Sequence, residues 1–223
     1  METVKQNPLS QCIPSARPRS YTFVALGMAE QLVTLKTALD SSTSRSLVLD
    51  GSVYLRAPEE VQLEYKQARL QKRHINLDRA AILRLPWSSL LPFGARCRLM
   101  EHRKTTGKDA PMPLFGLVSQ SMSFAGHTRP TLPCLMKNTL CVRVPDGRIL
   151  MPVEHFLAQG VPIFCDSLPP ELRALPDEEF LALGPTEARG MAGNMMHFAS
   201  ASSSLQLLLC CFRFDQQRDV DAN

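Results

Sequence analysis

Residues 148–162, RILMPVEHFLAQGVP, constrain the fold more than any other stretch of the chain. Arg148–Leu150 is expected to end a short extended segment. Pro152 suits the first turn of a helix, where its missing N–H costs nothing, and Glu154 then meets the positive end of the helix dipole. Gly160 is a natural helix stop, and the proline two residues later prevents continuation. The sequence therefore predicts a strand, a two-turn helix and a firm stop.

These residues resemble a motif of the DNA (cytosine-5) methyltransferases, in which the chain re-enters the catalytic domain after the target-recognition region. That motif reads approximately Arg-x-Leu-Thr-Pro-x-Glu, followed by Gln-Gly-x-Pro. The matching residues are Arg148, Leu150, Pro152, Glu154, Gln159, Gly160 and Pro162, whereas Met151 stands where threonine is usual. A second family motif, a Gly-Asn pair that opens the last helix, is similar to Gly193-Asn194. The two motifs come in the family's order, and the resemblance covers about residues 114–212.

The resemblance implies a fold similar to the C-terminal part of an α/β Rossmann-like methyltransferase, S-adenosylmethionine as cofactor and duplex DNA as partner. In the family the Gly-Asn pair lies beside the methionine moiety of the cofactor, so Gly193 and Asn194 are the candidate cofactor-binding residues. A glycine lets the backbone approach a ligand, and an asparagine amide both donates and accepts hydrogen bonds. The structural alternative is that Asn194 caps the long helix expected over Arg189–Phe212.

The reactive centre of the family is absent from this sequence. It has no Gly-rich cofactor loop, no Pro-Cys-Gln nucleophile loop and no Glu-Asn-Val acid, although the chemistry needs a cysteine that adds to a flipped-out cytosine. Cys134 follows a proline but precedes Leu135, and it lies in the lead-in to the motif of residues 148–162, here called the exit motif because the chain leaves the recognition region there. We therefore reject it as the nucleophile. We expect no catalytic residue and a chain that resembles a C-terminal fragment, inactive unless a complementing catalytic chain completes it.

A second function class stays open, a non-enzymatic nucleic-acid or protein-binding adaptor domain. Pro-x-Glu helix starts and Gly-Asn turns also occur in unrelated globular proteins. Charge does not decide between the two classes. Residues 1–104 hold 16 Lys and Arg against 9 Asp and Glu, an excess that suits phosphates but is equally typical of an ordinary solvated surface.

Local patterns predict an α+β fold with a small mixed sheet over 114–150 and flanking helices. The expected elements are helices over 27–39, 58–74, 77–85, 169–183 (two short ones) and 189–212, a hairpin over 46–56 around Asp50-Gly51, strands near 114–118 and 142–144, and a loop over 103–113. The expected domains are a disordered arm (1–20), a recognition-type region (21–113), a methyltransferase C-terminal segment (114–212) and a frayed tail (213–223).

The helix expected over 58–74 carries acidic residues at its start and basic residues later. Its basic residues are Lys66, Arg69, Lys72 and Arg73. This order complements the helix dipole, so it needs no ligand to explain it. Trp87, the single tryptophan, is interpreted as a core anchor rather than a platform for stacking bases.

The seven cysteines form no CxxC pair and no Cys/His ligand spacing, so we expect no metal site. An odd cysteine count without an apolar leader favours free thiols in a reducing compartment, the nucleus or the cytoplasm. No stretch approaches the roughly 18 apolar residues of a membrane span, and no membrane partner is expected.

Overall fold

The computed structural model describes residues 2–6, 19–23, 37, 50–106, 113–121, 123, 128–136, 138–164, 177–195, 201–202 and 205. The chain divides into two compact units, one of residues 50–195 and the other of residues 1–49 together with 196–223. In the second of these, β1 (Glu2–Gln6) lies within the arm expected over 1–20 and pairs antiparallel with β2 (Arg19–Phe23), which extends beyond that arm. The helix expected over 27–39 lies outside the described residues, apart from the helical Thr37.

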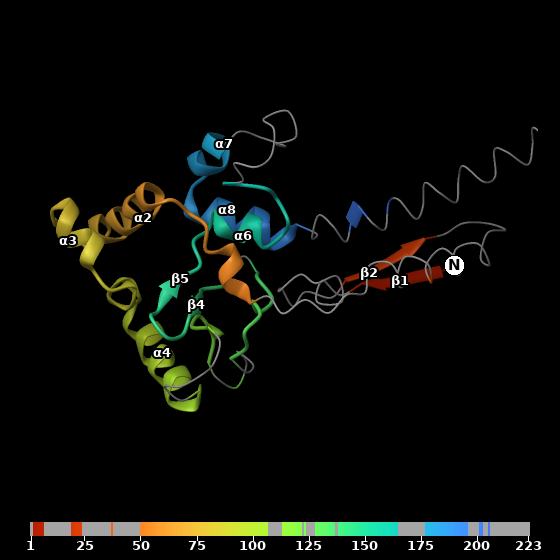
Figure 1. The fold of residues 1–223 in the computed structure, drawn as a ribbon, viewed down its shortest axis with the longest axis horizontal. Coiled ribbons are helices and arrows are strands. Elements are labelled where there is room, and N and C mark those ends of the chain that lie inside the picture. Colours follow the sequence, from red (N-terminus) through yellow and green to blue (C-terminus); the bar gives the residue numbers. More distant parts are fainter. Residues whose placement is uncertain are drawn as a thin grey trace, which may run out of the picture. The chain divides into compact units, whose positions relative to one another are not determined.

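The unit of residues 50–195 contains a small sheet and a series of short helices (Figure 1). Its elements are η2 (Gly51–Tyr54), α2 (Glu59–Gln71), α3 (Arg79–Arg84), η3 (Trp87–Leu90), α4 (Phe93–Thr106), β3 (Phe115–Leu117), β4 (Cys141–Arg143), β5 (Arg148–Ile149), α6 (Glu154–Leu157), α7 (Asp177–Ala182) and α8 (Pro185–Asn194). The α+β class is therefore confirmed.

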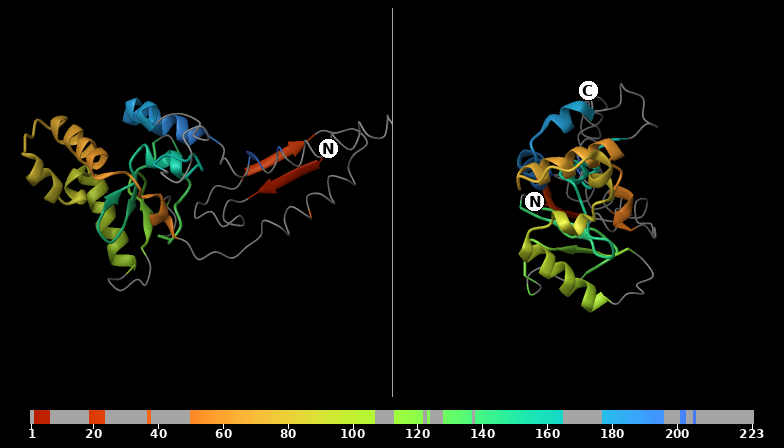
Figure 2. Two further views of the ribbon diagram at one scale, coloured as in Figure 1. Left: turned by 45° about the horizontal axis from the view of Figure 1, so that its top comes forward. Right: turned by 90° about the vertical axis from the view of Figure 1, so that its left-hand side faces the viewer.

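The sheet has the order β3-β4-β5 and is antiparallel throughout, so the expectation of a mixed sheet was wrong. For β4 and β5 the short connection explains this, because parallel neighbours need a crossover of a dozen or more residues, whereas these two strands are joined by a turn over 144–147. The sheet lies between α4 on one side and the α6–α8 pair on the other (Figures 1 and 2).

Helix α4 covers one side of the sheet through the buried side chains of Leu99 and His102. The His102 ring hydrogen-bonds the Leu117 carbonyl and the Thr128 hydroxyl. Near the end of α4, Arg103 donates to the carbonyls of Val144 and Pro145. The loop expected over 103–113 was therefore wrong for residues 103–106, which form the last turn of α4 because tertiary contacts hold it.

The hairpin expected around Asp50-Gly51 was also wrong, because η2 begins there. The Asp50 carboxylate accepts a hydrogen bond from the Ser52 N–H at 2.7 Å and caps this short helix. An aspartate competes for nearby backbone donors in this way, which favours caps as well as hairpin turns. Gly51 is buried, and a Cβ there would lie 2.9 Å from atoms of both Leu132 and Phe115.

The helices expected over 58–74 and 77–85 agree well with α2 and α3, and Asp78 caps α3 by accepting from the Ala81 N–H. The helix expected over Arg189–Phe212 agrees only in part, because residues 189–194, 201, 202 and 205 are helical but Met195 is not. Helix α8 begins earlier, at Pro185, and ends at Asn194, because Met195 has an extended backbone. Of the two helices expected over 169–183, α7 corresponds to the second, and the first lies outside the described residues.

Candidate functional site

Arg148 and Glu154, the two charged residues of the exit motif, form a buried ion pair. The Arg148 Nη2 atom lies 2.8 Å from Glu154 Oε1, and their side chains are 5% and 0% exposed. The Glu154 carboxylate also accepts the N–H of Met151 at 2.8 Å and that of Ala57 at 3.1 Å. Arg148 donates in addition to the carbonyl of Ile149. One carboxylate thereby joins β5, the start of α6 and the segment that leads into α2.

Burial and the polar contacts shift the pKa values of this pair in opposite directions. Burial raises the pKa of Glu154, while the guanidinium and the two backbone N–H groups pull it down. Burial lowers the pKa of Arg148, and the Glu154 charge opposes that shift. Because Glu154 already accepts three donors, the pair is suited to holding the fold and not to exchanging protons with a substrate.

The Trp87 ring lies against two cations. The Arg148 Cζ atom is 4.2 Å from the ring centroid, and the Lys66 Nζ atom is 4.9 Å from it. Lys66 also donates to the carbonyls of Ile82, Leu83 and Leu85, which close the end of α3. Burial and the nearby Arg148 charge lower the pKa of Lys66. Trp87 packs against two hydrophobic clusters, in agreement with its interpretation as a core anchor.

The remaining motif residues lie around the single turn of α6, which is half the length predicted for this helix. Pro152 is buried just before α6. Gly160 has a φ of +84° and ends the turn, as predicted. Gln159 is 1% exposed, and its Nε2 atom has no hydrogen-bond partner within the described part of the chain. The amide nitrogen of Gln159 is thus a buried donor without a matching acceptor there.

His155, which the sequence did not single out, is fully buried in α6. Neither of its ring nitrogens makes a hydrogen bond of normal geometry to a described residue. Burial, helped by the charge of Arg189, lowers its pKa to about 4, although the Leu150 backbone acts weakly in the opposite direction. The ring is therefore neutral at physiological pH.

Gly193 and Asn194, the candidate cofactor-binding residues, lie at the end of α8, so the expectation that they open the last helix was wrong. The alternative that Asn194 caps the start of a helix was wrong for the same reason. Gly193 is buried, whereas Asn194 is exposed. Helix α8 packs against α6 through the buried Ala188 and Ala192. The fold thus places the helix that carries this pair beside the exit motif.

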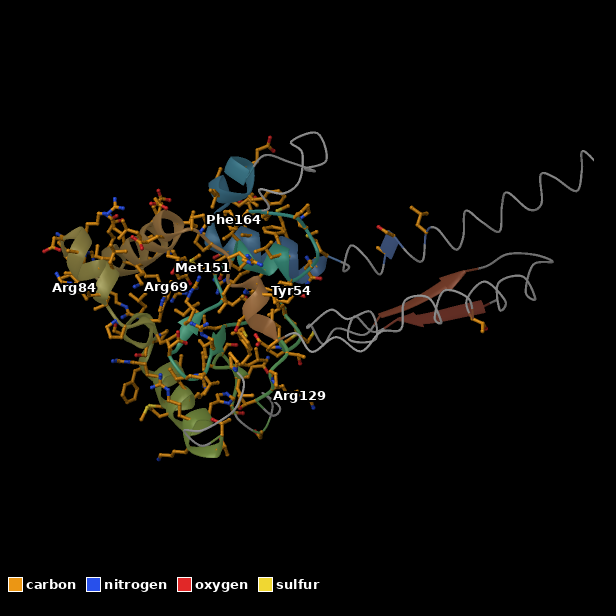
Figure 3. The ribbon with its side chains drawn as sticks, in the orientation of Figure 1. Tyr54, Arg69, Arg84, Arg129, Met151 and Phe164 are labelled. Carbon is orange, nitrogen blue, oxygen red and sulfur yellow. The ribbon has the colours of Figure 1, made fainter. Side chains whose placement is uncertain are left out.

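Two cavities border these elements. One, of about 180 Å³, is mainly apolar and lies between α2, the start of α6, α7 and α8, with Tyr65, Pro152 and Phe180 in its lining. The other, of about 290 Å³, is lined by Tyr65, Ala68, Arg69, Lys72, Arg73, Pro92, Pro185, Thr186 and Arg189. Figure 3 labels Arg69, which lines the larger cavity, and Met151, which lines the smaller one. Neither cavity is lined by Gly193 or Asn194.

The described cysteines are free, with Cys97 and Cys134 exposed and Cys141 buried. Burial raises the pKa of the Cys141 thiol, so it is not an activated nucleophile. Within the described residues, no three His, Cys, Asp or Glu side chains gather as metal ligands would. The helices described there include none long and apolar enough to cross a membrane.

No protein-family model matches the chain, and no curated protein matches its sequence.

Proposed function

We propose that the chain is the C-terminal part of a DNA (cytosine-5) methyltransferase-like protein. The observation that supports this most is the meeting of the motif's charged residues, Arg148 and Glu154, in one buried ion pair. A chance match in sequence does not require two of its members to pair in the fold. The packing of α8, which carries Gly193-Asn194, against α6 adds support, because it brings the helices of the two motifs together.

On this proposal the described residues are a scaffold and not a reactive centre. Arg148 and Glu154 fix the path of the chain around α6, and Asn194, exposed at the end of α8, is the polar group proposed to contact S-adenosylmethionine. The nucleophile and the Gly-rich loop come from a complementing catalytic chain, and duplex DNA is the proposed substrate of the completed assembly. The isolated chain is then expected to bind the cofactor weakly and to transfer no methyl group.

The first test is a calorimetric titration of the full chain with S-adenosylmethionine. Asn194→Ala is expected to weaken binding about tenfold, the effect of losing one hydrogen bond to a charged ligand. Asn76→Ala is the matched control, because Asn76 is also exposed and lies outside the motifs. No saturable binding, or equal binding by the two variants, would contradict the assignment of Asn194.

The second test is a tritiated-methyl transfer assay on DNA with the isolated chain, together with the mass of the protein in its source cells. Turnover by the isolated chain would refute the expectation that this chain lacks a reactive centre. A native product much heavier than 24.8 kDa would favour an upstream catalytic half. A product of this mass, with no turnover, would favour a non-catalytic protein.

The second candidate is a non-enzymatic adaptor domain, and two observations favour it. The Glu154 carboxylate is fully used within the fold, and α8 ends where the family's helix should begin. For an adaptor, Gln159→Ala and Asn194→Ala change stability alone, whereas a cofactor signal abolished by Asn194→Ala would count against this candidate.

A further inference from the structure

The larger cavity, here called the basic groove, gathers four positive side chains and no acidic one. Its lining includes Arg69 near the end of α2, Lys72 and Arg73 just after that end, and Arg189 from α8. Lys72 is the C-cap residue of α2 and keeps a helical backbone, so its side chain lies on the same face as that of Arg69, three residues earlier. Arg189 comes from an element more than 100 positions later in the chain. The fold thus brings together charges that the sequence keeps apart.

Three of the four cations that line the basic groove keep donors that the described residues do not use. Arg69 uses its Nε–H on the Tyr65 hydroxyl at 2.9 Å and lies over that ring. Arg189 uses its Nε–H on the Pro185 carbonyl at 3.1 Å. Within the described residues, both therefore keep the two terminal nitrogens of a guanidinium fork, which suit bidentate contact with phosphate. The Lys72 ammonium makes no hydrogen bond or ion pair to a described residue.

Arg73 has a different part in the basic groove. Its Nη1 and Nη2 atoms donate to the carbonyls of Ser89 and Leu90 at 2.8 and 2.6 Å. Its position is therefore fixed by η3, and it contributes charge to the groove. A cation held by the fold in this way loses little side-chain entropy when an anion arrives.

The rest of the lining is apolar or weakly polar. Ala68, Pro92 and Pro185 form a non-polar wall beside the cations, and Thr186 adds a hydroxyl. The volume of about 290 Å³ is close to the lower end of small-molecule sites, which begin at about 300 Å³. A concave site of this size holds a compact ligand better than a stretch of a rod-shaped duplex. The combination fits a molecule with phosphates at one end and an organic ring at the other.

We propose that the basic groove binds a compact small molecule with several phosphate groups, of the nucleoside polyphosphate class. The phosphates contact Arg69, Lys72 and Arg189, and the organic part lies against the non-polar wall. This inference goes beyond the methyltransferase proposal and does not depend on it, because none of the motif residues lines the groove.

The test is a calorimetric titration of the full chain with ATP in the absence of divalent cations. Lys72→Ala and Arg189→Ala are each expected to weaken ATP binding about tenfold, because each removes a charge-assisted contact to phosphate. Arg84→Ala is the matched control for Arg189→Ala. Arg84 is exposed on α3 and makes the same kind of single hydrogen bond, Nε–H to the carbonyl four residues earlier. Figure 3 shows it on α3, beyond Arg69.

Thermal unfolding of each variant checks that the fold is intact, and neither Lys72 nor Arg189 is fully buried. No saturable ATP signal would overturn the proposal, and so would equal losses in Arg189→Ala and Arg84→Ala.

Inorganic triphosphate is expected to bind more weakly than ATP, and equal binding would refute the role of the non-polar wall. Duplex DNA that displaces ATP and binds more tightly than ATP would overturn the compact ligand in favour of a nucleic-acid strand. Because the titration uses ATP, its failure leaves the S-adenosylmethionine test of the proposed function unaffected.

Discussion

Neutralising Glu154 should destabilise the unit of residues 50–195 far more than losing a surface ion pair would. The Glu154 side chain is 0% exposed and its partner Arg148 5% exposed, so Glu154→Gln leaves a guanidinium buried without its counter-charge. Two opposite charges about 4 Å apart attract by about 4 kcal/mol at an effective dielectric of about 20. Measured losses on breaking buried pairs are about 3–5 kcal/mol. Against a total stability of about 5–15 kcal/mol, this is a large fraction.

The assay is urea unfolding of the full chain, followed both by far-ultraviolet circular dichroism and by the fluorescence of Trp87, the single tryptophan. Arg148→Met and the double variant complete a mutant cycle, since methionine keeps apolar bulk against the Trp87 ring. We expect the double variant to be more stable than the sum of the single losses implies, by about 2 kcal/mol or more, because it buries no unpaired charge. A loss below about 1 kcal/mol in Glu154→Gln, the range of exposed pairs, would refute the reasoning. Strictly additive single effects would refute it as well.

Three further predictions concern His155 and two glycines. His155 has a pKa of about 4 in the folded chain against about 6.5 when unfolded. Its contribution to the free energy of unfolding is therefore fully present above pH 6.5. That contribution, about 3 kcal/mol, is lost as the pH falls towards 4. His155→Leu should flatten this part of the profile in urea unfolding at a series of pH values, and an unchanged slope would contradict the assignment. At Gly116 a Cβ would lie 2.9 Å from the His102 ring, which is held by two hydrogen bonds, so Gly116→Ala should destabilise by about 1–3 kcal/mol. Gly94→Ala meets nothing within 4 Å and should stabilise α4 by up to about 1 kcal/mol; thermal unfolding of the two variants, with opposite signs expected, checks both.

The parts of the fold that were predictable from the sequence carry local signals. Helix α2 follows a proline and two glutamates, and α3 follows a capping aspartate. Gly160 ends the turn that follows α6, because its positive φ suits glycine. The wrong predictions arise where one local sequence signal is compatible with two structures. Asp50-Gly51 is compatible with a hairpin or a helix cap, and the buried environment of Gly51 selects the cap.

The helix of the Gly-Asn pair was misplaced because small residues continue beyond it. Ala and Ser at 199–204 are compatible with a helix, so the sequence offers no stop near Asn194. Its Pro185 start, in contrast, carries a recognisable signal, a proline at the first helical position. That signal was available and would have placed Gly193-Asn194 inside the helix and not at its opening.

The candidate sites were only partly predictable, for a related reason. Arg148 and Glu154 are close in sequence, and the resemblance had already marked both. The basic groove joins α2 to α8, and the charge order along α2 has a sufficient explanation in the helix dipole. Only the packing of the two helices shows that Arg189 lies beside Arg69 and Lys72. Contacts of this range leave no periodic pattern for a sequence argument to detect.

The hydrogen bond from the Ala57 N–H to Glu154 has a consequence for the synthesis of the protein. The two residues are 97 positions apart, and a ribosome adds about 5–20 residues per second. About 5–20 s therefore pass between the synthesis of Ala57 and that of Glu154, whose carboxylate later accepts the Ala57 N–H. During that interval α2 and α3 can pair with each other, since their contacts are local. The hydrophobic surface that later meets α6 and α8 stays uncovered, so the nascent chain is most exposed to aggregation and to chaperones between the emergence of α2 and that of α6.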